Sequence, residues 1–307
     1  MDGRRSYREG GEIVEERVER ILSNKPERLL LDDWELQSIS PIVAGKKAAI
    51  AELAGRDSIA AAITCLEEMK VEALLPVYTY TGTEYGSFEY LGRAVEWLKR
   101  RLGSGRVGNL VLLGSPKFWH GLNGRWVKEL IGRYGFYTPC IGCHVYLHAS
   151  RIPLAKALGV KSIISGEREY HDGREKINQI SPAISAYRSL LFRFDVSLLT
   201  PLAKIRSSGE IDGIIGTKWD TMGDHLQCVL SANYRDAMDN LHFGPDHFDL
   251  DRIQGYLSEF ALPMASRVIE GLLRGEAMDY GRIARQVLEE RPRLMGGPKG
   301  EAWPSSS

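Results

Sequence analysis

Short apolar runs alternate with helix-length segments from residue 46 onward, and this alternation constrains the fold more than any other feature of the chain. The runs have the length and apolar composition of buried strands, at 46–53, 71–82, 109–115, 160–167 and 194–202. The segments between them have helical periodicity, at 58–70, 85–103, 124–135 and 144–159. This pattern predicts an α/β protein with a doubly wound, mostly parallel sheet and helices on both faces. In such sheets, ligands bind at the carboxyl ends of the strands.

The two ends of the chain lack this alternation. Residues 12–22 have the apolar spacing of an amphipathic helix, which we expect to pack on the main domain. After about residue 236 only helical patterns remain, followed by a loose tail. We therefore expect an N-terminal helical extension (1–45), an α/β domain (46–235) and a C-terminal helical region with its tail (236–307).

Composition and charge exclude several classes of protein. Lys plus Arg and Asp plus Glu both number 40, so an anionic partner would need a local basic patch. The charged N-terminus lacks the apolar core of a signal peptide, and no run of about 18 apolar residues occurs. We expect a cytoplasmic protein that does not contact membranes. In that reducing compartment, the four cysteines are expected to be metal ligands, reactive thiols or core residues rather than disulfides.

Cys140 and Cys143 form a C-x-x-C-H motif with His144. Haem attachment through this motif is disfavoured because it normally follows export. The cysteines could belong to an iron–sulfur cluster, form a redox or persulfide-carrying thiol pair, or bind zinc with a third cysteine and His144 as the fourth ligand. Cys65 lies among small apolar residues of a predicted helix, and we expect it in the core.

The turn after the first predicted strand has the features of a phosphate site. It contains Ala54, Gly55, Arg56, Asp57 and Ser58. Small residues let a ligand approach the backbone, and the N-terminus of the following helix offers N–H groups and partial positive charge to an anion. Asp57 and Ser58 could instead serve only as helix caps. The turn matches neither the G-x-G-x-x-G nor the G-x-x-x-x-G-K-[ST] motif.

The turn resembles the S-G-G-x-D-S loop of the PP-loop ATP pyrophosphatases, a family of alpha-hydrolase-like enzymes that adenylate a substrate and release pyrophosphate. Gly55, Asp57 and Ser58 match, whereas Leu53 and Ala54 replace Ser and Gly. The resemblance extends over about residues 46 to 235, through a small polar turn at 79–83. Further matches to the family's strand-end element and R-P-L segment are Ser165, Gly166, Glu167 and Arg168, then Pro201, Leu202, Glu210 and Ile211.

The order of the cysteines resembles the 2-thiouridine and 2-thiocytidine tRNA synthetase branch of this family. That branch carries C-x-x-C before the fourth strand and a third cysteine after the R-P-L segment, as Cys140, Cys143 and Cys228 do here. The resemblance implies that these thiolates, from a loop and a distant helix, hold a 4Fe-4S cluster whose fourth iron is open to sulfide or substrate. It also implies Mg²⁺ and ATP at the turn and at residues 166–168, and we expect Asp57 and Lys176 to act in catalysis.

Two further segments are candidates for binding. The loop 165–179 contains Glu167, Arg168, His171, Asp172, Arg174, Lys176 and Asn178. It could neutralise a triphosphate, bind magnesium or position an acceptor, and its place at a strand end favours these roles over a solvated charged loop. Between residues 97 and 137, basic side chains alternate with aromatic ones, which suits an RNA-facing surface or ordinary helix packing equally well. His120 and His148 have no partner spacing and are expected to be ordinary packed or surface histidines.

These features predict an ATP-dependent enzyme that adenylates an oxygen of its substrate and replaces it with sulfur from a donor. A tRNA base is the leading acceptor, and a small molecule is the alternative. Arg168 and Lys176 would stabilise charge on phosphate. Two other classes stay open: a cluster-bearing desulfurase that does not use ATP, and a zinc-stabilised binding module without catalysis. A homodimer is compatible with the sequence.

Overall fold

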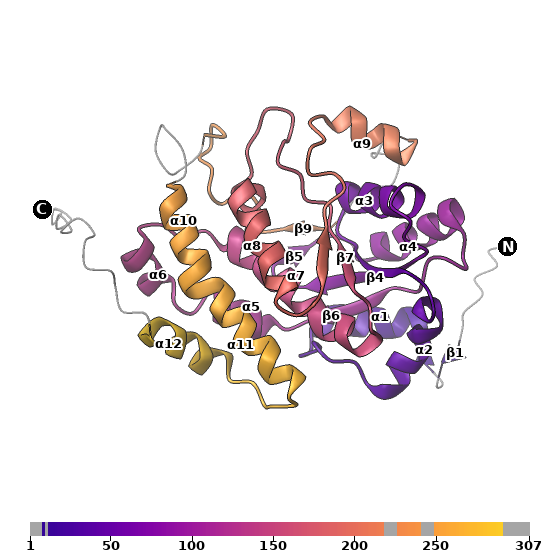
Figure 1. The fold of residues 1–307 in the computed structure, drawn as a ribbon, viewed down its shortest axis with the longest axis horizontal. Coiled ribbons are helices and arrows are strands. Elements are labelled where there is room, and N and C mark those ends of the chain that lie inside the picture. Colours follow the sequence, from indigo (N-terminus) through magenta and orange to yellow (C-terminus); the bar gives the residue numbers. More distant parts are fainter. Residues whose placement is uncertain (1–7, 10–11, 218–225, 241–248, 291–307) are drawn as a thin grey trace, which may run out of the picture.

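A five-stranded parallel sheet forms the centre of the computed structural model, which describes residues 8–9, 12–217, 226–240 and 249–290 (Figure 1). Its strands are β3 (Ala48–Glu52), β4 (Ala73–Tyr80), β6 (Val111–Gly114), β7 (Ser162–Ile164) and β8 (Ser197–Leu199). Their order is β6-β4-β3-β7-β8, so the chain starts in the middle, winds to one edge and then to the other. The prediction of a doubly wound parallel sheet is confirmed. The direction of winding reverses between β3 and β7, where such folds bind ligands.

Helices cover both faces of the sheet. From the N-terminus they are α1 (Val14–Asn24), α2 (Asp33–Val43), α3 (Arg56–Glu67), α4 (Glu89–Leu102), α5 (Pro116–Asn123), α6 (Val127–Tyr134), α7 (Pro139–Leu158), the short 3₁₀ helix η1 (Ile177–Gln179), α8 (Ser181–Phe192) and α9 (Ser208–Ile215). The C-terminal helices are α10 (Leu250–Tyr256), the π-helical turn η3 (Leu257–Ala261), α11 (Leu262–Leu273) and α12 (Tyr280–Glu290). Two antiparallel pairs complete the described elements: β1 (Arg8–Glu9) with β2 (Glu12–Ile13), and β5 (Glu84–Tyr85) with β9 (Gln227–Cys228).

Strand side chains alternate between two hydrophobic cores. Adjacent residues of a strand point to opposite faces, so Ile50 enters one core and Ala49 the other. The core on the Ile50 face includes side chains of α7, α8 and α11, and the core on the Ala49 face includes those of α3 and α4. In Figure 1 the C-terminal helices accordingly lie to the left of the sheet and α3 and α4 to the right.

Helix α7 begins earlier than the sequence pattern predicts. The expected start was His144, but Thr138 caps the helix by accepting a hydrogen bond from the Cys140 N–H at 3.3 Å, and Pro139 occupies the first helical position. Cys140 and Cys143 therefore lie in the first turns of a helix. The expectation that they lie in a loop is wrong.

The terminal helices pack on the sheet domain. Leu22 of α1 is fully buried in the core that contains Ala49, as expected for the N-terminal helix. On the other face, Met264 and Val268 of α11 share a core with Tyr146 of α7. The domain boundaries near residues 45 and 235 stay a prediction, and the predicted tail lies outside the described residues. No helix in the described part of the chain has the length and apolar character needed to cross a membrane.

Candidate functional site

The turn between β3 and α3 is held by Ser58. Its buried hydroxyl accepts hydrogen bonds from the N–H groups of Ala54 and Gly55, both at 3.0 Å, and donates to the Gly55 carbonyl at 2.7 Å. Ser58 thus performs the capping role that the sequence left open. Gly55, Arg56 and Asp57 stay partly exposed at the carboxyl edge of the sheet.

The loop after β7 lies directly against this turn. A Cβ atom on Gly166 would lie 2.5 Å from the Asp57 carbonyl carbon and 2.5 Å from the Ser58 nitrogen, so only glycine fits at this contact. The next residue but one, Arg168, is 2% exposed and donates from Nε to the Asp57 carboxylate at 2.8 Å. Parallel strands β3 and β7 are neighbours, and their carboxyl ends therefore bring residues 54–58 and 166–168 together.

Positive charge surrounds the turn. The Arg56 Nε contacts the other oxygen of Asp57 at 3.0 Å, and its Nη2 lies 3.2 Å from the Ser208 hydroxyl at the start of α9. Lys176 is half-buried, and burial lowers its pKa, with the charge of Arg168 adding to this effect and that of Asp57 opposing it. Arg56 and Arg168 thus contact the two oxygens of Asp57, and Lys176 lies within the electrostatic reach of that carboxylate.

His171 in the same loop gives the protein a predicted sensitivity to acid. Burial, together with the positive charges of Lys176 and Arg168, lowers its pKa to about 4 from an ordinary 6.5. Between these values the unfolded chain binds a proton that the folded protein excludes, so stability is lost as the pH falls from 6.5 to 4. His171→Gln should flatten the pH dependence of the unfolding free energy across this window by roughly 2 kcal/mol, after discounting for solvent screening. Parallel wild-type and variant curves in urea titrations would contradict this assignment.

The three cysteines gather beside the turn that follows β4. Cys228 lies in β9, which pairs with β5 so that Cys228 is opposite Glu84. Its sulfur is 3.1 Å from the Thr83 hydroxyl and accepts from the Leu230 N–H at 3.4 Å. The Cys140 sulfur lies 3.7 Å from the carbonyl oxygen of the same Leu230. Cys228 is therefore in a short strand, and the expectation that it lies in a helix is wrong, although its place beside Cys140 agrees with the cysteine order.

The thiols lie close enough to influence the pKa values of one another. Burial raises the pKa of Cys140 to about 11, and the neighbouring Cys228 adds to the shift. Burial also raises the pKa of Cys143, with further contributions from Cys228 and Cys140. Cys65 is fully buried in the core, as expected, and is separate from the other three.

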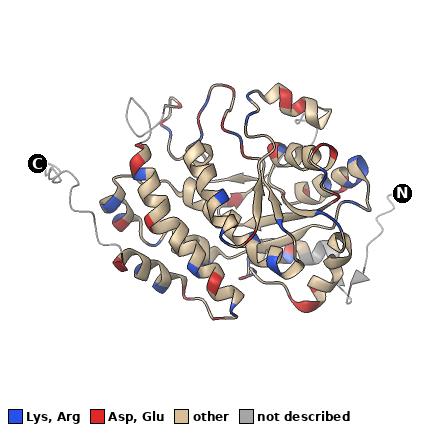
Figure 2. Ribbon diagram, viewed as in Figure 1, with Lys and Arg blue, Asp and Glu red and all other residues tan. Residues whose placement is uncertain are grey.

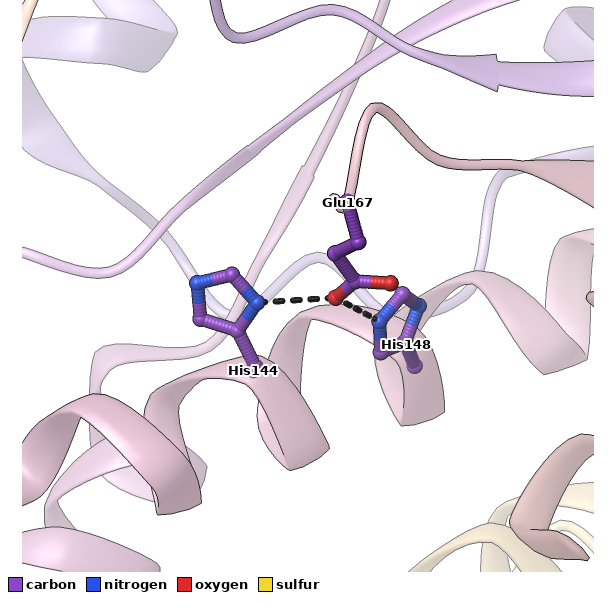
Figure 3. Close-up of side chains that lie close together, drawn as sticks. All are labelled: His144, His148 and Glu167. Atoms are coloured by element: carbon purple, nitrogen blue, oxygen red, sulfur yellow. Dashed lines mark hydrogen bonds and ion pairs between the residues drawn. The ribbon is translucent and has the colours of Figure 1, made fainter. Parts of the chain in front are cut away.

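His144 joins a second cluster, with His148 and Glu167 (Figure 3). Its Nδ1 lies 2.9 Å from Glu167 Oε1, and its Nε2 lies 2.7 Å from the Asn178 side-chain amide. His148, one helical turn further along α7, places Nε2 2.7 Å from the same Glu167 oxygen. Because both ring nitrogens of His144 are engaged here, His144 does not complete a zinc site with the cysteines in this arrangement.

The sequence did not predict two buried charged contacts at the carboxyl edge of the sheet. His148 is 1% exposed and contacts Glu167, so it is not an ordinary packed histidine. The buried Arg151, also on α7, pairs with Glu52 at the end of β3 at 3.0 Å. The four-residue spacing of His144 and His148 signals a shared helix face, but nothing in the sequence signals Glu167 as their partner.

Comparison with known proteins places the chain among relatives. It is 39% identical over 247 residues to uncharacterized protein MJ0009 of Methanocaldococcus jannaschii, a match covering 79% of this chain and 87% of the relative. The chain belongs to the MJ0009 family. No family model matches the sequence.

Two solved structures show a partial likeness to this member of the family. A 4-thiouridine synthetase in complex with RNA and ATP is 16% identical, with a TM-score of 0.44. The match covers 72% of this chain and 53% of that one. The U34-tRNA thiolase NcsA from Methanococcus maripaludis, with its 4Fe-4S cluster, is 14% identical, with a TM-score of 0.39 and coverage of 86% of this chain and 80% of that one.

Proposed function

We propose that this protein is an ATP-dependent thiolation enzyme of the PP-loop type and that its acceptor is a tRNA base. An oxygen of the acceptor attacks the α-phosphorus of ATP, and pyrophosphate leaves. A sulfur nucleophile then adds to the activated carbon, and AMP leaves with the original oxygen. Every residue of the proposed nucleotide site comes from the carboxyl edge of β3 and β7, the expected place for a ligand in this fold.

The observation that carries the proposal is the unsatisfied hydrogen-bond donor of the buried Arg168 side chain. Its guanidinium is almost fully buried, yet Nη1 has no hydrogen-bond partner among the described residues. A buried charged donor without a partner is costly, and a phosphate oxygen would satisfy it. Arg56 contacts Asp57 and Lys176 is near enough for the charge of Asp57 to act on it, so the site has the charge to hold a polyphosphate. Asp57 offers the carboxylate that a magnesium ion bound with ATP would use.

The cysteine site supports the sulfur half of the proposal. Thiol donors suit an iron–sulfur cluster, and Cys140, Cys143 and Cys228 approach one another from α7 and β9. When bound, a 4Fe-4S cluster with three protein ligands supplies an open iron that can hold sulfide. Glu167 and Arg168 are adjacent in the chain and join the two halves, because Arg168 contacts Asp57 while Glu167 contacts His144, which follows Cys143.

The acceptor is assigned from the resemblance and from the basic, aromatic stretch 97–137. Within it, the Arg125 guanidinium lies 5.8 Å from the Trp126 ring centroid, whereas Lys99 and Arg101 pair with acidic side chains. Basic and acidic residues are interspersed over the helices (Figure 2), so RNA contact would depend on local groups rather than on a strongly basic face.

The position at which ATP is cleaved tests the proposed function. With anaerobic protein, tRNA and sulfide, α-labelled ATP should yield AMP and pyrophosphate. Asp57→Asn should slow this reaction on the order of 100-fold, since losing one preorganised electrostatic contact typically costs that much. Asp195→Asn, at an exposed position paired with Lys156, is the matched control and should retain activity. Formation of ADP, or no cleavage of ATP under any of these conditions, would refute the proposal.

A further inference from the structure

Among the described residues, His144, His148 and Glu167 form a group of three metal-ligating side chains whose donor atoms all lie within 4.8 Å of one another. The two histidines project from successive turns of α7, and Glu167 reaches between them from the loop after β7 (Figure 3). Their contacts to Glu167 Oε1 measure 2.9 and 2.7 Å. Ligand atoms of a single first-row ion lie about 2.9 to 3.4 Å apart, so the two histidine–carboxylate distances would need to change by less than about 1 Å on metal binding.

The charge of Glu167 is the feature that calls for a ligand. At this edge of the sheet, Glu52 is paired with Arg151 and Asp57 with Arg168. The ion-pair partners of Glu167 within the described part of the chain are the two histidines, which carry charge only when protonated. Glu167 is 2% exposed, and its Oε2 has no hydrogen-bond partner among the described residues. A buried carboxylate with an unused oxygen is costly unless a cation compensates it.

The surroundings fix the histidine rings as they are fixed around bound metals. Asn178 contacts His144 Nε2 at 2.7 Å, and an amide oxygen there could accept the ring N–H while Nδ1 binds the ion. The buried Tyr187 ring lies against both imidazoles, with centroid separations of 6.0 and 4.9 Å. Such outer contacts orient ligands and set the tautomer.

We propose that His144, His148 and Glu167 bind a first-row divalent transition metal, at a site separate from the three cysteines. Two imidazoles and a carboxylate suit zinc, manganese or ferrous iron and leave coordination positions for water or substrate. The site adjoins both halves of the proposed active site, because Glu167 precedes Arg168, which contacts Asp57, and His144 follows Cys143.

Cobalt titration of the anaerobically purified full-length protein tests this site, because thiolate ligands give Co²⁺ a near-ultraviolet charge-transfer band that imidazole and carboxylate do not. Wild type and Cys228→Ser should each bind one Co²⁺ at this site. That ion should give visible d–d absorption and no thiolate charge-transfer band. His148→Gln and Glu167→Gln should weaken binding roughly 100-fold or more, and Asn178→Ala about 10-fold, in line with the cost of losing outer contacts. His120→Gln, at an exposed position on α5, should bind as wild type does.

Two results would overturn the proposal: no Co²⁺ bound outside the cysteines, or Co²⁺ binding without the thiolate band that persists in folded His148→Gln protein. Should the buried variants fail to fold, as judged by circular dichroism, His144→Asn at the partly exposed end of the cluster provides the same test. Cobalt binding does not involve ATP or sulfur transfer. Failure of the thiolation assay with intact cobalt binding would therefore reject the proposed function alone.

Discussion

Cys228→Ser is expected to remove the iron and acid-labile sulfide from anaerobically reconstituted protein and to lower sulfur transfer on the order of 100-fold or more, since loss of even an outer-shell contact to a metal site costs 10- to 100-fold. Cys228 has no covalent link to the C-x-x-C pair. The pairing of β9 with β5 and the contacts of Cys228 and Cys140 with Leu230 hold the two thiols near each other. Serine keeps the size and the hydrogen bonds but is a poor ligand for iron. Iron and sulfide analysis with visible absorption measures the first effect.

Cys65→Ser is the matched control for this experiment. Cys65 is fully buried in the core, and burial raises its pKa to about 12, so its thiol is neither exposed nor ionised. The substitution should cost stability without changing the iron content. Equal iron loss in both variants would show that the effect comes from unfolding, and unchanged iron in Cys228→Ser would reject Cys228 as a ligand.

Gly166→Ala is expected to abolish nucleotide use while leaving the fold in place. The added methyl group would lie 2.5 Å from two backbone atoms of the turn at Asp57 and Ser58, so the turn or the loop after β7 must move. Overpacking of this kind typically costs about 1 to 3 kcal/mol, less than the roughly 5 to 15 kcal/mol by which folded domains are stable, so the fold should persist. A displacement on the order of 1 Å at a reacting site costs about 100-fold in rate. ATP binding by calorimetry and AMP formation should both show the loss.

The matched glycine is Gly92 in α4. A Cβ there meets no atom within 4 Å, and its backbone is helical, so Gly92→Ala should be neutral or slightly stabilising. If Gly166→Ala and Gly92→Ala bind ATP equally well, the nucleotide does not use the junction of these two loops.

Much of the fold followed from local patterns. The runs that became β3 and β4 are apolar enough to be buried on both faces, which only a covered parallel sheet allows. Local patterns failed where a capping residue sets the start of a helix. Thr138 and Pro139 start α7 before the cysteines. They also failed at α8, whose apolar spacing at Ala183, Tyr187 and Leu190 was not recognised.

The site could be predicted only as far as the order of the strands along the chain implies where the loops that follow them lie. Carboxyl ends of neighbouring parallel strands converge, so the contact of Gly166 with Asp57 and Ser58 agrees with the pairing of β3 and β7. The partners of His148 and Glu52 lie on other elements. The spacing of residues along the chain does not predict which side chains of two elements come into contact. Buried charge pairs such as Glu52 with Arg151 are therefore findings of the three-dimensional structure.

The ratio of AMP released to thionucleoside formed by the wild-type protein tests most directly whether the nucleotide turn and the three cysteines serve one reaction. With cluster-loaded protein, tRNA, ATP and sulfide, we expect one AMP for each thionucleoside found by mass spectrometry of the digested tRNA. AMP release without any thionucleoside, or thionucleoside formed without ATP, would contradict a single site built from these two halves.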